Sequence, residues 1–190
     1  MVKVPKLSVL LRLLAVAATI AAGAVQSPRV QAADEPRADG PPVVMDGWRY
    51  TKSANDVHLF DCDTAACVQG SRVSYRFYPA GTTMPLSQYR SEQEIVAKAL
   101  QQRAPPGTKI TIGAIEGDDA DTLPRMYKAR RLTVRPDGSQ EHVHSGLLMG
   151  GKASASLISS SSDEKAATDS YAQFALLLML VIQGSRDQKK

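Results

Sequence analysis

The stretch DEKAATDSYAQFALLLMLVIQ, residues 163–183, decides the fold. Tyr171, Phe174 and Leu178 recur in it at helical spacing, and the neighbouring leucine, methionine, valine and isoleucine residues widen this apolar stripe until little polar surface remains. Two acidic residues open the stretch and a glycine follows it, as is usual at the two ends of a helix. A helix that is apolar on nearly all sides must be buried against its own domain or against a partner. We therefore expect a long C-terminal helix that a sheet covers.

The first residues have the pattern of a secretory signal peptide over 1–32. A basic start is followed by an apolar run at 13–22 and by small residues that fit a cleavage site before Ala33 or, alternatively, after Ala24. The alternative is an N-terminal membrane anchor, but the run is shorter than the roughly 20 residues that span a bilayer. We expect a periplasmic or secreted protein of the bacterial cell envelope, with no stable membrane span after cleavage.

The net charge of +4 comes from the expected signal peptide. The segment before Asp34 contains Lys3, Lys6, Arg12 and Arg29 and no acidic residue, so the remaining chain carries basic and acidic residues in equal number. A neutral mature chain gives no reason to expect a nucleic-acid partner.

The mature chain has the length of one domain. Residues 33–46 are rich in Ala, Pro, Asp and Gly and predict a flexible tether. Residues 47–184 are expected to form a single domain, and 185–190 a disordered tail.

Strands dominate the prediction for the folded part. Clean alternation in 72–78 predicts a half-buried strand. One helix is expected at 91–102, with Ser91 and Glu94 as a capping box. Its apolar stripe is formed by Ile95, Val96, Ala99 and Leu100. Further strands are expected at 48–51, 57–60, 108–116, 125–135, 140–149 and 152–160.

Short turns between consecutive strands favour antiparallel pairing. The sequence therefore predicts an α+β domain in which an antiparallel sheet packs against two helices, including the long C-terminal one. Paired strands, a helix, a meander and a serine-rich last strand (154–162) that continues into the C-terminal helix resemble the PsbP-like α/β/α sandwich over most of 48–183. This resemblance implies an accessory or binding module.

The two cysteines, Cys62 and Cys67, have the spacing C-x4-C. In an exported chain such a pair predicts a structural disulfide. The alternatives lack their motifs, because C-x-x-C is absent and no other cysteine could complete a thiolate zinc site.

His142 and His144 are two apart in an expected strand, so both side chains point to one face. Such a pair could hold a transition metal, with His58 or an acidic residue as the third ligand. The alternative is that both histidines face solvent on the polar side of the sheet.

Residues 125–135 are strongly basic, and Lys128, Arg130 and Arg131 are candidates for contact with an anion or a partner. The alternative is an edge strand, on which charge prevents edge-to-edge aggregation.

Support for catalysis is weak, since the chain has no Gly-x-Ser-x-Gly elbow and no phosphate-binding loop, and no cofactor motif is present. We therefore expect a non-enzymatic accessory module that binds an unidentified protein or envelope component. The alternative is a small periplasmic hydrolase or metal-dependent enzyme that uses His142 and His144. The surplus apolar width of the C-terminal helix leads to a further hypothesis, a homodimer formed through that helix.

Overall fold

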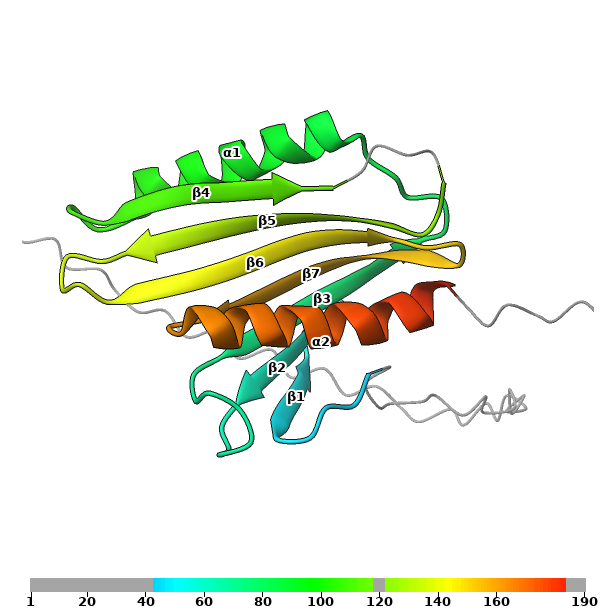
Figure 1. The fold of residues 1–190 in the computed structure, drawn as a ribbon, viewed down its shortest axis with the longest axis horizontal. Helices are drawn as coiled ribbons and strands as arrows, with labels where there is room; N and C mark the ends of the chain where they lie inside the picture. The colour runs from blue at the N-terminus through cyan, green and yellow to red at the C-terminus, as the bar shows by residue number, and fades with distance from the viewer. Residues whose placement is uncertain (1–42, 118–121, 184–190) are drawn as a thin grey trace, which may run out of the picture. The chain divides into compact units, whose positions relative to one another are not determined.

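The structure is a computed structural model that describes residues 43–117 and 122–183. The expected leader, most of the tether and the expected tail lie outside the described residues. The elements, in chain order, are β1 (Trp48–Lys52), β2 (His58–Cys62), β3 (Arg72–Pro79), α1 (Leu86–Arg103), β4 (Lys109–Glu116), β5 (Arg125–Val134), β6 (Gln140–Met149), β7 (Ala153–Ser161) and α2 (Glu164–Gln183) (Figure 1).

The strands form one seven-stranded antiparallel sheet in the order β1-β2-β3-β7-β6-β5-β4. Most sequence neighbours pair directly, and the exception is β3, which pairs with β7 after the chain has passed through α1 and the β4–β5–β6 meander. The predicted α+β class with an antiparallel sheet and two helices is confirmed. The interpretation of the basic segment as an edge strand is wrong, because β5 lies between β4 and β6 and β4 forms the edge.

The helix α2 begins where the sequence predicts, with the Asp163 carboxylate accepting a hydrogen bond from the Ala166 N–H at 2.7 Å. Tyr171, Phe174 and Leu178 are buried against the sheet, where α2 packs on β6 and β7. Each large apolar side chain buried in this way stabilises the fold by roughly 1.5–3 kcal/mol. Among the described residues, α2 is long and apolar enough to cross a membrane, but its inner face belongs to the core of this domain.

The helix α1 packs on the opposite face of the sheet and forms a second, smaller core. Leu86 and Tyr89 of α1 cluster there with Tyr127 and other side chains of β5 and β6. The expected start of this helix was five residues too late, and the capping box is wrong: Pro85 occupies the N-cap position without a side-chain cap. The helix begins earlier because Leu86 and Tyr89 pack against the sheet. The buried residues of α1 are Leu86, Tyr89 and Ala97, and none of them belongs to the expected apolar stripe.

The strand β2 ends in the predicted cysteine pair. The sulfur atoms of Cys62 and Cys67 lie 2.00 Å apart, at disulfide distance. The bridge closes the loop that leads from β2 towards β3. The folded core also extends back to Val43, which the sequence assigns to the tether but which is buried with Phe60 and Phe174.

Candidate functional site

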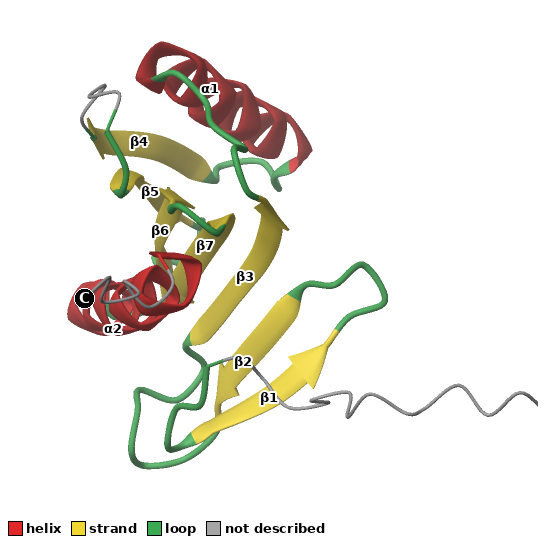
Figure 2. Ribbon diagram, turned by 90° about the vertical axis from the view of Figure 1, so that its right-hand side faces the viewer, coloured by secondary structure: helices red, strands yellow, loops and turns green. Residues whose placement is uncertain are grey.

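One face of the sheet is covered only in part. The helix α1 packs over β4 and β5, while α2 covers the other face. Figure 2 shows β3 uncovered between α1 and the β1–β2 hairpin, with α2 on the far side of the sheet. We call the uncovered surface the open face and define it by Leu59, Ser74, Arg76, Ser156 and Ile158.

The register of the strands places the open-face side chains in rows across the sheet. Leu59 pairs with Ser74, and Ser74 pairs with Ile158, so these three side chains are direct neighbours on one face. Ile158 is 45% exposed and Leu59 is 37% exposed. Ile158 on the central strand β7 and Leu59 on β2 thus lie in one row, separated by Ser74, and no helix of the described chain covers them.

A hollow of about 300 Å³ lies beside this row, between α1 and the strands β3 and β7. Its walls include apolar and aromatic side chains, and small hydroxyl side chains line its floor and rim. Its lining includes Tyr78, Met84, Tyr89, Ser145, Ser156 and Ile158, together with the acidic residue Glu92 of α1. The hollow exists because serine stands at floor positions where a larger side chain would fill the space.

Hydrogen bonds to α1 hold the wall of the hollow in place. The Tyr89 hydroxyl donates to the Ser145 carbonyl oxygen at 2.9 Å, and the Ser145 hydroxyl donates to the Gln93 side chain at 2.8 Å. Burial raises the pKa of Tyr89 to about 12, so its hydroxyl remains a neutral donor at physiological pH. The hollow is therefore pre-formed in this chain.

The charges on this face differ between its two ends. At the β1–β2 end, Asp61 forms ion pairs with Arg72 at 3.2 Å and with Arg49 at 3.8 Å, so the charges there compensate each other. Beside the hollow, the guanidinium of Arg76 lies over the ring of Tyr78, 5.6 Å from its centroid. Within residues 43–117 and 122–183, Arg76 forms no ion pair.

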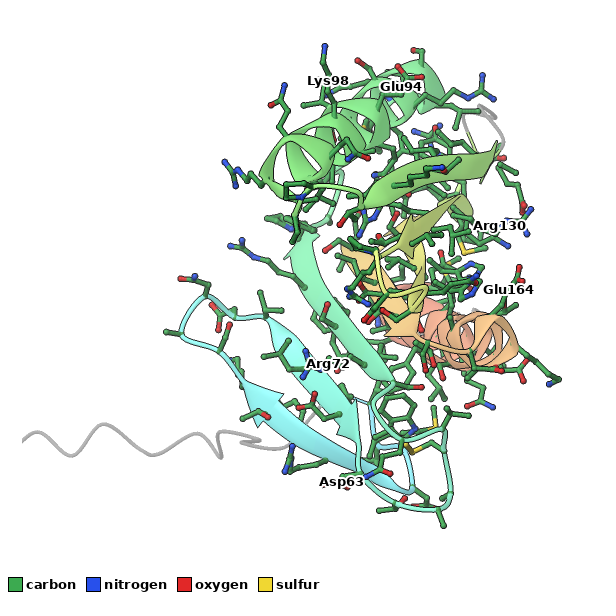
Figure 3. The ribbon with its side chains drawn as sticks, turned by 90° about the vertical axis from the view of Figure 1, so that its left-hand side faces the viewer. Asp63, Arg72, Glu94, Lys98, Arg130 and Glu164 are labelled. Atoms are coloured by element: carbon green, nitrogen blue, oxygen red, sulfur yellow. A yellow bond between two sulfur atoms is a disulfide. The ribbon has the colours of Figure 1, made fainter. Side chains whose placement is uncertain are left out.

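The predicted histidine pair lies on the other face, near the start of α2. His142 and His144 share a pocket of about 290 Å³ with Arg130 and Glu164, which we call the histidine pocket. Figure 3 shows Arg130 on β5 and Glu164 at the start of α2 on the same side of the molecule. The structure thus brings together the two histidines, a carboxylate and Arg130, and the predicted residue Arg131 is also part of the pocket lining.

His144 is nearly fully buried, so its expected exposure to solvent is wrong. Its Nε2 atom lies 3.1 Å from the Thr168 hydroxyl, which itself donates to the Glu164 carbonyl oxygen at 2.8 Å. The Nε2–H group must therefore be the donor to Thr168, and Nδ1 has no partner among the described residues. Burial lowers the pKa of His144, the charges of Lys128 and Arg130 lower it further, and Glu164 and Glu116 partly oppose them.

A third metal ligand is not found beside the histidine pair. His58 lies on β2, three strands away from β6, which is about 14 Å across a sheet. It is stacked on Tyr75 at 4.7 Å and bonded to the Tyr50 hydroxyl at 3.0 Å. In the part of the chain that the structure describes, no group of three His, Cys, Asp or Glu side chains could hold a metal ion. Metal binding by His142 and His144 stays a prediction.

The three predicted basic contact residues do not form one surface. Arg130 faces the histidine pocket, whereas Arg131, the next residue along β5, points to the α1 side. Lys128 forms an ion pair with Glu116 at 3.2 Å. Arg131 is half-buried, and burial lowers its pKa while Glu141 opposes this effect. Contact with an anion through all three residues at once would therefore require two faces of the sheet.

Sequence reasoning predicted the strands of the open face but not its hollow. The signal was present in the serine-rich strand, in which Ser154, Ser156, Ile158 and Ser160 alternate with inward-facing residues. On the α2 side, Ser159 donates to the Ala167 carbonyl oxygen at 3.0 Å and Ser161 accepts from the Asp163 N–H at 3.1 Å, so these serines fasten α2 to the sheet. The serines of β7 therefore form two sets. Those on the α2 side bond to that helix, and those on the other side lie on the open face.

No family model matches the chain, and no curated protein matches it. Among solved structures, the chain is similar to the solution structure of cyanobacterial PsbP (CyanoP) from Synechocystis sp. PCC 6803, with a TM-score of 0.43 and 11% sequence identity. The match covers 73% of this chain and 96% of that chain. This match carries no function, partner or location for the chain.

Proposed function

We propose that this chain is an exported, non-enzymatic accessory module of the bacterial cell envelope that binds a protein segment through its open face. The observation that carries the proposal is Ile158, which is 45% exposed at the middle of the sheet beside a hollow of about 300 Å³. A scattered surface isoleucine needs no explanation, but an isoleucine in a row with Leu59 and beside an apolar hollow does.

The hollow has the size and lining that suit one anchoring side chain of a partner. Its volume lies at the low end for ligand pockets, which span about 300–1,000 Å³. Protein interfaces are commonly anchored by one large apolar or aromatic side chain in such a pocket, surrounded by contacts that exclude water. The apolar wall and hydroxyl rim of the hollow suit a side chain of this kind.

The charge beside the hollow indicates what flanks the anchor. Arg76 is exposed, forms no ion pair within the described chain and lies over Tyr78, so its guanidinium is available to a carboxylate of the partner. We therefore expect a segment in which a large apolar side chain is followed or preceded by Asp or Glu. At the other end of the face, Asp61 is already paired with Arg49 and Arg72, so we expect these charges to contribute less to binding of the partner.

Export is supported by the leader pattern at 1–32 and by the Cys62–Cys67 bridge, because disulfides persist in oxidising compartments.

Site-specific photo-cross-linking in the cell envelope tests this proposal. A photoreactive residue at Ile158, and separately at Leu59, is expected to capture the same protein. The matched control is Ile95 on α1, which is 63% exposed but lies outside the open face. If position 95 captures that protein as efficiently as position 158, or if neither open-face position captures a common protein, the proposal is wrong.

The second candidate function, a small hydrolase or metal-dependent enzyme, rests on one observation, the histidine pocket with His142, His144 and Glu164. The geometry of the histidine pocket favours a structural role for His144. The Thr168 hydroxyl already donates to a backbone carbonyl oxygen, and no carboxylate among the described residues accepts a hydrogen bond from the His144 ring. Calorimetric titration with zinc and with copper tests the metal form. Binding that disappears in His142→Gln would support this candidate over the first.

A further inference from the structure

The pocket at the C-terminal end of α1 contains the predicted anion contact Arg131. It has a volume of about 310 Å³ and lies between the last turn of α1, the start of β4 and the turn from β5 to β6 (Figure 1). Its charged lining residues are Arg103, Arg131, Arg135 and Glu141, and we call it the arginine pocket. It shares no lining residue with the hollow of the open face.

Arg131 is half-buried in this pocket without a partner. Its Nε atom is buried and finds no hydrogen-bond acceptor among the described residues, and its guanidinium forms no ion pair with them. Burial lowers the pKa of Arg131, but an arginine side chain stays protonated in proteins. Withdrawing a charged donor from water without supplying an acceptor is unfavourable, so such a group requires an explanation.

The other charges of the arginine pocket are compensated within the chain. The Arg135 guanidinium forms an ion pair with the Glu141 carboxylate at 3.1 Å. Glu141 opposes the lowering of the Arg131 pKa, but its carboxylate contacts Arg135 instead. Arg103 is exposed in the last turn of α1, where it offsets the partial negative charge of the helix C-terminus. The pocket therefore holds one positive charge, that of Arg131, for which the described chain supplies no counterion.

Thr108 supplies a second polar group without a partner. It is only 7% exposed, and its hydroxyl has no hydrogen-bond partner among the described residues. Its backbone is fixed, since the N–H donates to the Pro105 carbonyl oxygen at 3.1 Å and the carbonyl oxygen accepts from Gln101 at 2.9 Å. The two turns beside it are in contact, because a Cβ atom added at Gly107 would lie 3.3 Å from the Cγ atom of Pro136. The hydroxyl and the guanidinium thus belong to two residues that line one rigid pocket.

The remaining walls of the pocket are largely apolar. Leu100, Ile110 and Pro136 line it, and Leu100 is 38% exposed. A phosphate dianion carries more charge than Arg131 compensates, and it would lie near the Glu141 carboxylate. A carboxylate with an aliphatic substituent carries one charge and presents an apolar surface to these walls. This combination fits the lining better than an inorganic anion does.

We propose that the arginine pocket binds a small organic carboxylate with a short aliphatic substituent. The guanidinium of Arg131 donates two parallel hydrogen bonds to the carboxylate, an arrangement that arginine frequently forms. The Thr108 hydroxyl donates a third, and the substituent packs against Leu100 and Ile110. Of the three basic residues predicted to contact an anion, Arg131 alone belongs to this site. The site is separate from the open face, so either can exist without the other.

Titration of the purified protein with isovalerate, a carboxylate with an isobutyl group, tests the proposal. The Nε–H signal of Arg131 in proton–nitrogen correlation spectra, identified by its absence in Arg131→Lys, is expected to shift to saturation. Isovaleramide, which has nearly the same shape without the charge, is expected to bind at least about tenfold more weakly. Inorganic phosphate at the same ionic strength is also expected to bind more weakly than isovalerate.

Each alternative has its own result. The absence of a saturable shift with isovalerate would overturn the site. Equal binding of isovaleramide would show that the pocket recognises apolar surface and not charge, and would contradict the role of Arg131. Phosphate binding as tight as that of isovalerate would overturn the assignment to a carboxylate.

Two substitutions in the pocket test the roles of its donors by calorimetry. Arg131→Lys keeps the charge but loses the planar fork and is expected to weaken isovalerate binding about tenfold or more. Thr108→Val removes the hydroxyl at nearly constant shape and is expected to weaken binding about fivefold. The matched control is Arg90→Lys, because Arg90 is exposed on α1 and lies outside the pocket. Unchanged affinity in both pocket variants, at thermal midpoints that show folded proteins, would contradict the proposal.

Discussion

Gly146 on β6 shows how a single residue sets the fit between α2 and the sheet. A Cβ atom at this position would overlap the Tyr171 hydroxyl and would lie 3.0 Å from the Tyr127 carbonyl oxygen. Tyr171 is 3% exposed, and its hydroxyl finds no hydrogen-bond partner among the described residues. The absence of a side chain at Gly146 therefore makes room for the ring of Tyr171. In this position the Tyr171 hydroxyl is buried without a hydrogen-bond partner among the described residues.

Gly146→Ala is expected to lower the free energy of unfolding by about 1–3 kcal/mol, the usual cost of an overpacked core. Tyr171→Phe alone is expected to change stability little or to raise it, because it removes a buried hydroxyl that has no partner. The double variant should recover part of the loss, since the hydroxyl is the atom nearest to the added methyl group. Urea denaturation of the four proteins measures this coupling, and simple additivity would contradict the packing described here.

His144 predicts a pH dependence of stability. Its folded-state pKa is lowered from the ordinary value of 6.5, chiefly by burial, so the unfolded chain binds a proton more readily than the folded chain does. Stability is therefore expected to fall as the pH decreases below about 6.5 towards the folded-state pKa of the histidine. His58 acts in the same direction, since burial and Lys52 lower its pKa.

The contribution of His144 is measured from the free energy of unfolding at pH 7.5 and at pH 5. His144→Gln should reduce the difference between the two values, and the remaining difference should diminish further in a variant that also carries His58→Gln. An unchanged difference in His144→Gln would show that the folded protein binds a proton at this histidine as readily as the unfolded chain.

At the scale of elements, α1 protects the exposed edge of the sheet. The Gln101 side chain accepts a hydrogen bond from the Ile110 N–H at 2.8 Å and donates to the Thr108 carbonyl oxygen at 2.9 Å. It therefore occupies one backbone group of the edge strand β4 and one of Thr108, the residue just before that strand, as a neighbouring strand would. An unprotected edge invites pairing with another chain.

Gln101→Ala is expected to expose this edge. The amide proton of Ile110 should lose its protection against hydrogen exchange, and the protein should aggregate more readily on concentration, with a loss of stability of about 1 kcal/mol. Gln102→Ala, at an exposed neighbouring position, serves as the control. Unchanged exchange at Ile110 in Gln101→Ala would contradict the role of this side chain.

The elements show what local sequence could predict. The strand β3 and the helix α2 were predicted closely, because alternation and helical spacing are local signals that the core here reinforces. The start of α1 was missed because Ser91 and Glu94 imitate a cap, whereas the helix begins where Leu86 and Tyr89 meet Tyr127, a contact distant in sequence. The burial of His144 was missed for the same reason, since it depends on α2 lying above β6.

At the scale of the whole molecule, the two faces of the sheet have different surroundings. The face under α2 is packed with large side chains, and on the other face α1 stops short of β3 and β7. Sequence patterns predict which side chains share a face but not how much of that face a helix covers. Predicting the open face would therefore have required the strand order. Leu59 and Ile158 are far apart in sequence, and the pairing of β3 with β7 brings them into one row.

The claim that the open face binds a protein segment is tested most directly by filling the hollow. Ser156→Trp places a large side chain on its half-exposed floor, and Thr51→Trp adds the same side chain at an exposed position of β1. Calorimetry with the partner captured from position 158 should show at least about tenfold weaker binding for Ser156→Trp and unchanged binding for Thr51→Trp, at equal thermal midpoints. Binding of Ser156→Trp as tight as that of the unaltered protein would contradict the account.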